Sequence, residues 1–68
     1  MKLKFTTNER GHRVFKVGER YFRAFWMDLG RVWVVMETGA DGGTSFREVG
    51  ERKNWRQVEV LAAGLEPR

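Results

Sequence analysis

The sequence contains no cysteine, a single proline, Pro67, and a single histidine, His12, among its 68 residues. Without cysteine, neither a disulfide framework nor a thiolate metal site can support a core of this size, and a reducing compartment, the cytoplasm, is expected. The lone histidine has no second histidine and no cysteine with which to form a metal site or a nucleophile pair. We therefore expect no metal, no cofactor and no enzymatic activity.

Long apolar runs are also absent. No run approaches the roughly 20 residues that a membrane-spanning helix needs, and the segment "MKLKFTTNERG" lacks the apolar stretch of a signal peptide. The sequence shows no internal repeat, no low-complexity tract and no linker. We expect a soluble, unprocessed chain with no membrane partner, folded as one domain over residues 1–68. A domain of this length buries only about 60% of the surface that its unfolded chain exposes.

Positive charge is in excess and is unevenly placed. Thirteen Lys and Arg residues face nine Asp and Glu residues, for a net charge of +4. Residues 1–31 carry eight basic and three acidic groups, whereas residues 32–68 carry five basic and six acidic groups. Nine of the cations are arginines, which bond bidentately, stack on rings and are enriched at interface hot spots. This pattern favours an anionic partner, either nucleic acid or an acidic protein face.

Strands are predicted in the first half of the chain. The segments "KLKFT", "HRVFKV", "RYFRAFWM" and "RVWVVMET" are short, rich in aromatic and β-branched residues, and separated by "NERG", "GE" and "DLG". This pattern is typical of an antiparallel β-meander. The glycines of "GADGGTS" then predict a loop. The segment "SFREVG" fits either a fifth strand or a single helical turn, because Ser45 and Glu48 suit a capping box.

The C-terminal segment "NWRQVEVLAAG" has apolar residues at helical spacing, with Asn54 in the N-cap position and Gly64 as a stop. We predict a helix at about 55–63. A strand stays open as an alternative, because Val58, Val60 and Ala62 also alternate. The predicted fold is α+β: a small antiparallel four- to five-stranded meander packed on one face by the C-terminal helix. The alternative is a small all-β barrel, SH3-like or OB-like.

The register of the third and fourth strands decides which side chains share a face, because a shift of one residue moves all of them across. If "DLG" is a three-residue loop with Gly30 left-handed, Trp26 lies opposite Val32 and one face is uniformly apolar. If "LG" is a two-residue loop, Trp26 lies opposite Trp33 and both faces are mixed. We prefer the first register, because burying an unpaired charge is costly. Its one exception is Arg13, which falls on the apolar face.

The preferred register leaves an open face on which rings alternate with cations. Its predicted partner-binding residues are Lys16, Tyr21, Arg23, Phe25, Arg31 and Trp33. Faces of this kind hold single-stranded nucleic acid, because bases stack on the rings and cations follow the phosphates. We therefore expect a non-enzymatic, small basic binding module whose partner is nucleic acid. A helix–turn–helix over 45–68 is disfavoured, because the cations lie mainly in the N-terminal half.

A protein partner is the second hypothesis for the same face. Trp, Tyr, Phe, Met and Arg are enriched at protein interfaces. A small basic domain can also act as a stoichiometric inhibitor that docks on a nucleic-acid-processing machine, as phage-encoded antagonists of host defence do. The rings could instead form a second small core, covered by the "GADGGTS" loop, by the "SFREV" segment or by a second copy of the chain in a homodimer.

Overall fold

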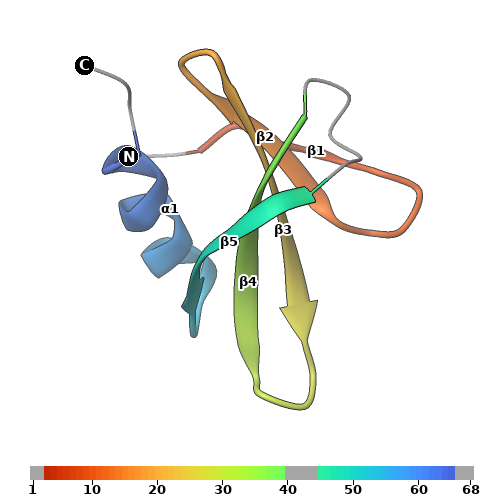
Figure 1. Cartoon of the computed structure of the whole chain (residues 1–68). Coiled ribbons are helices and arrows are strands. Elements are labelled where there is room, and N and C mark those ends of the chain that lie inside the picture. The colour runs from red at the N-terminus through yellow and green to blue at the C-terminus, as the bar shows by residue number, and fades with distance from the viewer. Residues whose placement is uncertain (1–2, 40–44, 66–68) are drawn as a thin grey trace.

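The computed structural model describes residues 3–39 and 45–65 of the chain, which form one antiparallel sheet and one helix (Figure 1). The sheet has the strand order β1-β2-β3-β4-β5. In chain order the elements are β1 (Thr6–Thr7), β2 (Arg13–Val17), β3 (Arg20–Met27), β4 (Val32–Thr38), β5 (Ser45–Arg52) and α1 (Trp55–Ala63). The predicted α+β meander is confirmed. The C-terminal segment is a helix, and the barrel alternative is not needed.

Two segments differ in detail from the expectation. The first strand is short and starts later than "KLKFT", because only Thr6 and Thr7 pair with β2. The segment "SFREVG", which fitted a strand or a helical turn, is part of β5. Most of the predicted "GADGGTS" loop lies outside the described residues.

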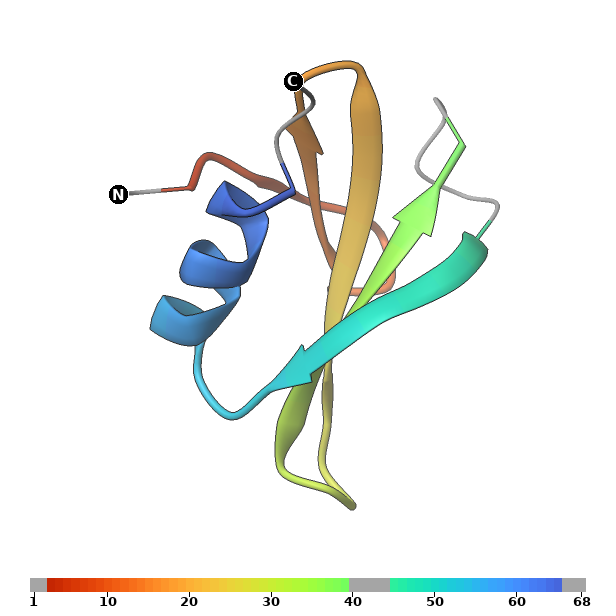
Figure 2. The same cartoon turned by 60° about the vertical axis from the view of Figure 1, so that its left-hand side comes forward.

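Helix α1 lies on one side of the sheet, which we call the covered face, and we call the other side the open face (Figures 1 and 2). The buried core between helix and sheet consists of Phe15, Val17, Phe22, Ala24, Val35, Val58 and Ala62. Phe15 and Phe22 are cross-strand partners whose rings stack with centroids 5.4 Å apart. Burying such side chains is the main favourable term in the folding of a small domain.

Local capping interactions explain why α1 begins and ends where the sequence predicted. Asn54 is extended, and its side chain accepts a hydrogen bond of 2.9 Å from the backbone N–H of Gln57. The Gln57 side chain in turn accepts a bond of 3.2 Å from the backbone N–H of Lys53. These bonds satisfy N–H groups that have no partner within the helix. Gly64 ends the helix by donating to the carbonyls of Val60 and Leu61.

The predicted register of the β2–β3 hairpin is confirmed. Phe15 pairs with Phe22 and Lys16 pairs with Tyr21 across a two-residue turn. Gly18, the first residue of that turn, has a φ of 62°, which a type II′ turn requires and which glycine adopts without steric cost.

The preferred register of the β3–β4 hairpin is wrong. Trp26 pairs with Trp33, which is the register of the alternative considered, rather than with Val32. The strands are joined by the four residues 28–31, and the left-handed residue of this loop is Arg31, with a φ of 52°, instead of Gly30. Every residue of β4 therefore faces the side opposite to the one expected.

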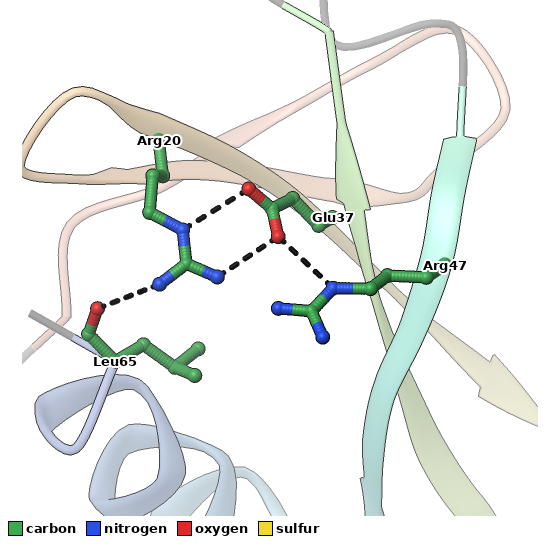
Figure 3. A network of polar contacts seen from close by, with 4 residues as sticks. All are labelled: Arg20, Glu37, Arg47 and Leu65. Atoms are coloured by element: carbon green, nitrogen blue, oxygen red, sulfur yellow. Dashed lines mark hydrogen bonds and ion pairs between the residues drawn. The ribbon is translucent and has the colours of Figure 1, made fainter.

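The charge that argued against this register is Glu37, which pairs with Phe22 on the covered face. Two guanidinium groups neutralise it (Figure 3). Arg20 donates from Nε to Glu37 Oε2 at 3.0 Å and from Nη2 to Oε1 at 2.8 Å, and Arg47 donates from Nε to Oε1 at 3.3 Å. Arg20 Nη1 also donates to the carbonyl of Leu65 at 3.1 Å, just beyond α1. The network thus joins β3, β4 and β5 to the end of the helix.

The same network shifts two pKa values. Hydrogen bonding from Arg20 lowers the pKa of Glu37 from its ordinary value of 4.5 to about 2, and the Arg47 guanidinium adds to this effect. The pKa of Arg20 is raised by its bond to Glu37. A carboxylate that accepts charge-assisted bonds of this kind stays ionised in the folded chain well into the acid range.

This network predicts a specific dependence of stability on pH. Because the pKa of Glu37 is lower in the folded chain, its contribution is fully present above pH 4.5 and is lost as the pH falls toward 2. The variant Glu37→Gln should have a lower Tm than the parent at pH 7, and the difference should shrink across that window. Thermal unfolding followed by circular dichroism at several pH values measures this. A Tm difference that stays constant from pH 7 to pH 2 would contradict it, and Glu19→Gln, in an exposed turn, is the control.

A matched pair of helix variants tests how α1 is docked. Val58 is fully buried against the sheet, whereas Val60 on the same helix is 71% exposed. Val58→Ala removes buried methyl groups and leaves a cavity, so it should lower the free energy of unfolding by about 2 kcal/mol. Val60→Ala should leave it unchanged or slightly higher, because alanine is the better helix former. Urea unfolding measures both, and equal effects would mean that α1 packs through another face.

Candidate binding surfaces

The structure divides the six predicted partner-binding residues between three places. Lys16, Tyr21, Arg23 and Phe25 lie on the open face, as expected. Arg31 lies in the exposed β3–β4 loop. Trp33 was expected beside Phe25 on the open face, and that placement is wrong: it lies on the covered face and packs against the core. The six residues therefore do not form one surface.

On the open face, β2 and β3 form two contacts that involve aromatic rings. Lys16 Nζ lies 5.4 Å from the centroid of the Tyr21 ring, and the imidazole of His12 lies 5.1 Å from that of Phe25. Burial lowers the pKa of His12, and the nearby positive charge of Arg23 lowers it further. The imidazole is therefore neutral at pH 7 and contributes ring surface rather than charge.

Strands β4 and β5 give the rest of the open face a different character. Because of the observed register, Val34 and Met36 lie on this face beside Phe25 and Arg23. The next strand carries Glu51 opposite Val34 and Glu48 opposite Met36. The open face is therefore basic over β2, apolar in its middle and acidic over β5.

A second surface lies on the covered face, where four aromatic rings follow one another. Trp26 contacts Trp33 at a centroid distance of 5.7 Å, Trp33 contacts Trp55 at 5.1 Å, and Trp55 contacts Phe5 at 5.1 Å. All three contacts are edge-to-face, the arrangement that the quadrupoles of aromatic rings favour. We call Phe5, Trp55, Trp33 and Trp26 the aromatic row. It joins the segment before β1, the start of α1 and the β3–β4 hairpin.

Arg13 lies within this row. Its guanidinium carbon is 4.4 Å from the ring centroid of Phe5, 4.8 Å from that of Trp33 and 4.4 Å from that of Trp55. Cation–π attraction to three rings explains how Arg13, the one charged residue predicted on the apolar face, is tolerated there. Its expected position opposite Ala24 is confirmed.

The aromatic row is partly open to solvent. Trp26 is 44% exposed and Phe5 38%, while Trp33 and Trp55 are half-buried. The Trp26 indole Nε1 donates to Asp28 Oδ1 at 2.9 Å, which holds this ring in place.

Cations border the row. Arg52 pairs with Trp33 in the β4–β5 register, and Lys53 and Arg56 lie two residues before and one residue after Trp55 in the sequence. The first turn of α1 holds no acidic residue. The sequence prediction included Trp33 but missed the other three rings of the row, Phe5, Trp26 and Trp55, and the nearby Arg13 and Arg52. The two-residue loop alternative was the signal that would have brought Trp26 and Trp33 together.

Comparisons with protein-family models, with curated proteins and with solved structures found no match for this chain. Within residues 3–39 and 45–65, no cluster of three or more His, Asp or Glu side chains is placed to hold a metal ion. In the same residues, the one helix is too short and too polar to cross a membrane. The proposals below therefore depend on the geometry of the two surfaces.

The position of Arg13 predicts that its substitution lowers the stability of the fold. Arg13→Met keeps an apolar stem of similar length but removes the cation, so the free energy of unfolding should fall by about 1 kcal/mol. The emission maximum of the tryptophans should also shift, since the guanidinium contacts two of them. Urea unfolding followed by fluorescence measures both effects. Arg10→Met, in an exposed turn, should change neither, and an equal loss in both variants would rule out a specific role for the rings.

Proposed function

We propose that the protein is a non-enzymatic module that binds single-stranded nucleic acid along the aromatic row. The continuity of the row supports this most directly: four rings follow one another at 5.1 to 5.7 Å, and Arg13 contacts three of them. Bases stack on exposed rings without regard to their identity, and each stack contributes about 1 to 3 kcal/mol. Binding of this kind would tolerate many sequences.

The charges around the row also support an anionic ligand. Arg52 is the cross-strand partner of Trp33, and Lys53 and Arg56 lie within two residues of Trp55 in the sequence, so three cations are near the row and could contact a phosphate backbone. The N-terminus of α1 adds a partial positive charge, and no acidic side chain in its first turn opposes it. The open face suits a polyanion less well, because Glu48 and Glu51 lie on it. The acidic residues near the row, Asp28 and Glu59, already accept hydrogen bonds from Trp26 Nε1 and the Leu3 N–H. The aromatic row is therefore the preferred site, although the sequence favoured the other face.

A protein partner is the second candidate, and a different feature favours it. Leu29, at the tip of the β3–β4 hairpin, is 97% exposed, with Met27 at 41% and Trp26 at 44% nearby. Trp26 and Met27 lie on opposite faces of the hairpin, so its end exposes apolar side chains on both sides and at the tip, which suits insertion into a pocket of another protein. A stoichiometric inhibitor of a nucleic-acid-processing machine would use such a tip.

Fluorescence anisotropy with a labelled, unstructured oligonucleotide tests the first candidate. Trp26→Ala removes an exposed ring and should raise Kd by about 5- to 150-fold, the equivalent of one base stack. The binding of the parent should weaken steeply with salt, since cations on the protein replace the counterions of the phosphates. No binding at about 50 mM salt would overturn the proposal.

Two identical substitutions then locate the site. Lys53 lies two residues before Trp55 of the aromatic row and Lys16 lies on the open face, and both are exposed. Lys53→Gln should weaken binding and reduce the slope of log Kd against log salt concentration by about one. Lys16→Gln should change neither the affinity nor this slope. The reverse result would move the site to the open face. If binding is absent but the chain captures a protein from nuclease-treated lysate, and Leu29→Ala abolishes the capture, the protein partner is favoured.

A further inference from the structure

We infer that the open face is the interface of a symmetric homodimer. This surface is distinct from the aromatic row, since the two lie on opposite sides of the sheet, so the inference goes beyond the proposed function and does not depend on it. Among the described elements, α1 is the one that packs against a face of the sheet, and it takes the covered face (Figure 2).

The middle of the open face is apolar. Its central strands contribute Phe25, Met27, Val32, Val34 and Met36. Met27 is 41% exposed, Phe25, Val32 and Met36 are half-buried, and Val34 at the centre is already buried in the single chain, so a second copy would contact the residues around Val34. An apolar patch of this extent on a small protein usually marks a contact surface, and aromatic residues and methionine are enriched in such contacts.

The charges on this face identify the partner as a second copy. Lys16 on β2 and Arg23 on β3 lie on one side of the apolar middle, and Glu48 and Glu51 on β5 lie on the other. A surface with opposite charges on its two sides is complementary to a second copy of itself that is rotated by 180° to face it. An unrelated partner would need the same arrangement by chance, and a polyanion would meet the two glutamates.

The order of the strands selects one symmetry axis. A two-fold axis that runs along the strands, between β3 and β4, places β2 of each copy over β5 of the other, because both strands are equally far from that axis. Lys16 then lies over the position of Ser45 of the second copy, two pairing positions along the strand from Glu48, which its long side chain can approach, and the same contact occurs twice. A two-fold axis across the strands would instead place β2 over β2 and β5 over β5, where like charges repel.

The size of the face indicates a dimer of moderate strength. The five strands hold 2, 5, 8, 7 and 8 residues, which at about 3.3 Å per residue and about 4.8 Å between strands give a flat area of about 500 Å² per copy. Two copies together bury about 1,000 Å², slightly below the range for stable specific interfaces. We therefore expect dissociation in the micromolar range rather than an obligate dimer.

Sedimentation velocity over about 5 to 500 µM protein tests the inference. The parent should move from monomer to dimer with rising concentration, and high salt should favour the monomer. Lys16→Glu and Glu48→Lys each place like charges together, so each should raise the dimer Kd by about tenfold or more. The double variant Lys16→Glu/Glu48→Lys restores the attraction with the signs exchanged and should return the Kd toward that of the parent.

Both side chains are exposed, so the variants should stay folded, which circular dichroism checks. Glu19→Lys, in the turn between β2 and β3, reverses a charge off the face and should leave the dimer intact. A chain that stays monomeric over the whole range overturns the inference. A dimer that tolerates both single variants overturns the assignment of this face. Oligonucleotide binding along the aromatic row is measured separately, so each proposal can fail without the other.

Discussion

The pairing of Trp26 with Trp33 across the β3–β4 hairpin determines what each side of the sheet can do. It brings both tryptophans to the side of α1, where Trp55 continues the row, and it leaves Val34 and Met36 on the opposite side. A shift of β4 by one residue would move Trp33 to the open face and Val34 and Met36 to the side of α1, while Trp26 would stay in place. The aromatic row would then be interrupted and the open face would lose two of its apolar residues, so the two candidate surfaces depend on one register.

Features that depend on neighbouring residues were predictable from the sequence. Gly18 favours the two-residue turn that sets the β2–β3 register, because its positive φ costs glycine little. Asn54 and Gly64 mark the ends of a helix whose apolar spacing is plain, and α1 has the predicted bounds. The α+β class and the meander followed from these local patterns. In each case the deciding interaction lies within a few residues along the chain.

Features that depend on distant residues were not predictable in this way. The β3–β4 register was rejected because it placed Glu37 on the covered side, yet Arg20 and Arg47 from two other strands neutralise this carboxylate. Arg13 likewise depends on rings contributed by three separate segments. The sequence of a hairpin considered alone shows none of these partners, so the cost of burying Glu37 was overestimated. The observed register was rejected for that reason, and Trp33 was placed on the wrong face.

The loop of this hairpin also shows which part of it supplies the stability. Arg31 holds a left-handed conformation, which costs an L-residue with a side chain about 1 kcal/mol, and Leu29 beside it is almost fully exposed. Residues 28–31 thus do little to hold the strands together, and the pairs along β3 and β4 must do so instead. The tip is therefore a position at which sequence can be exchanged or lengthened at small cost to the fold, so its recognition properties can change while the sheet beneath it stays the same.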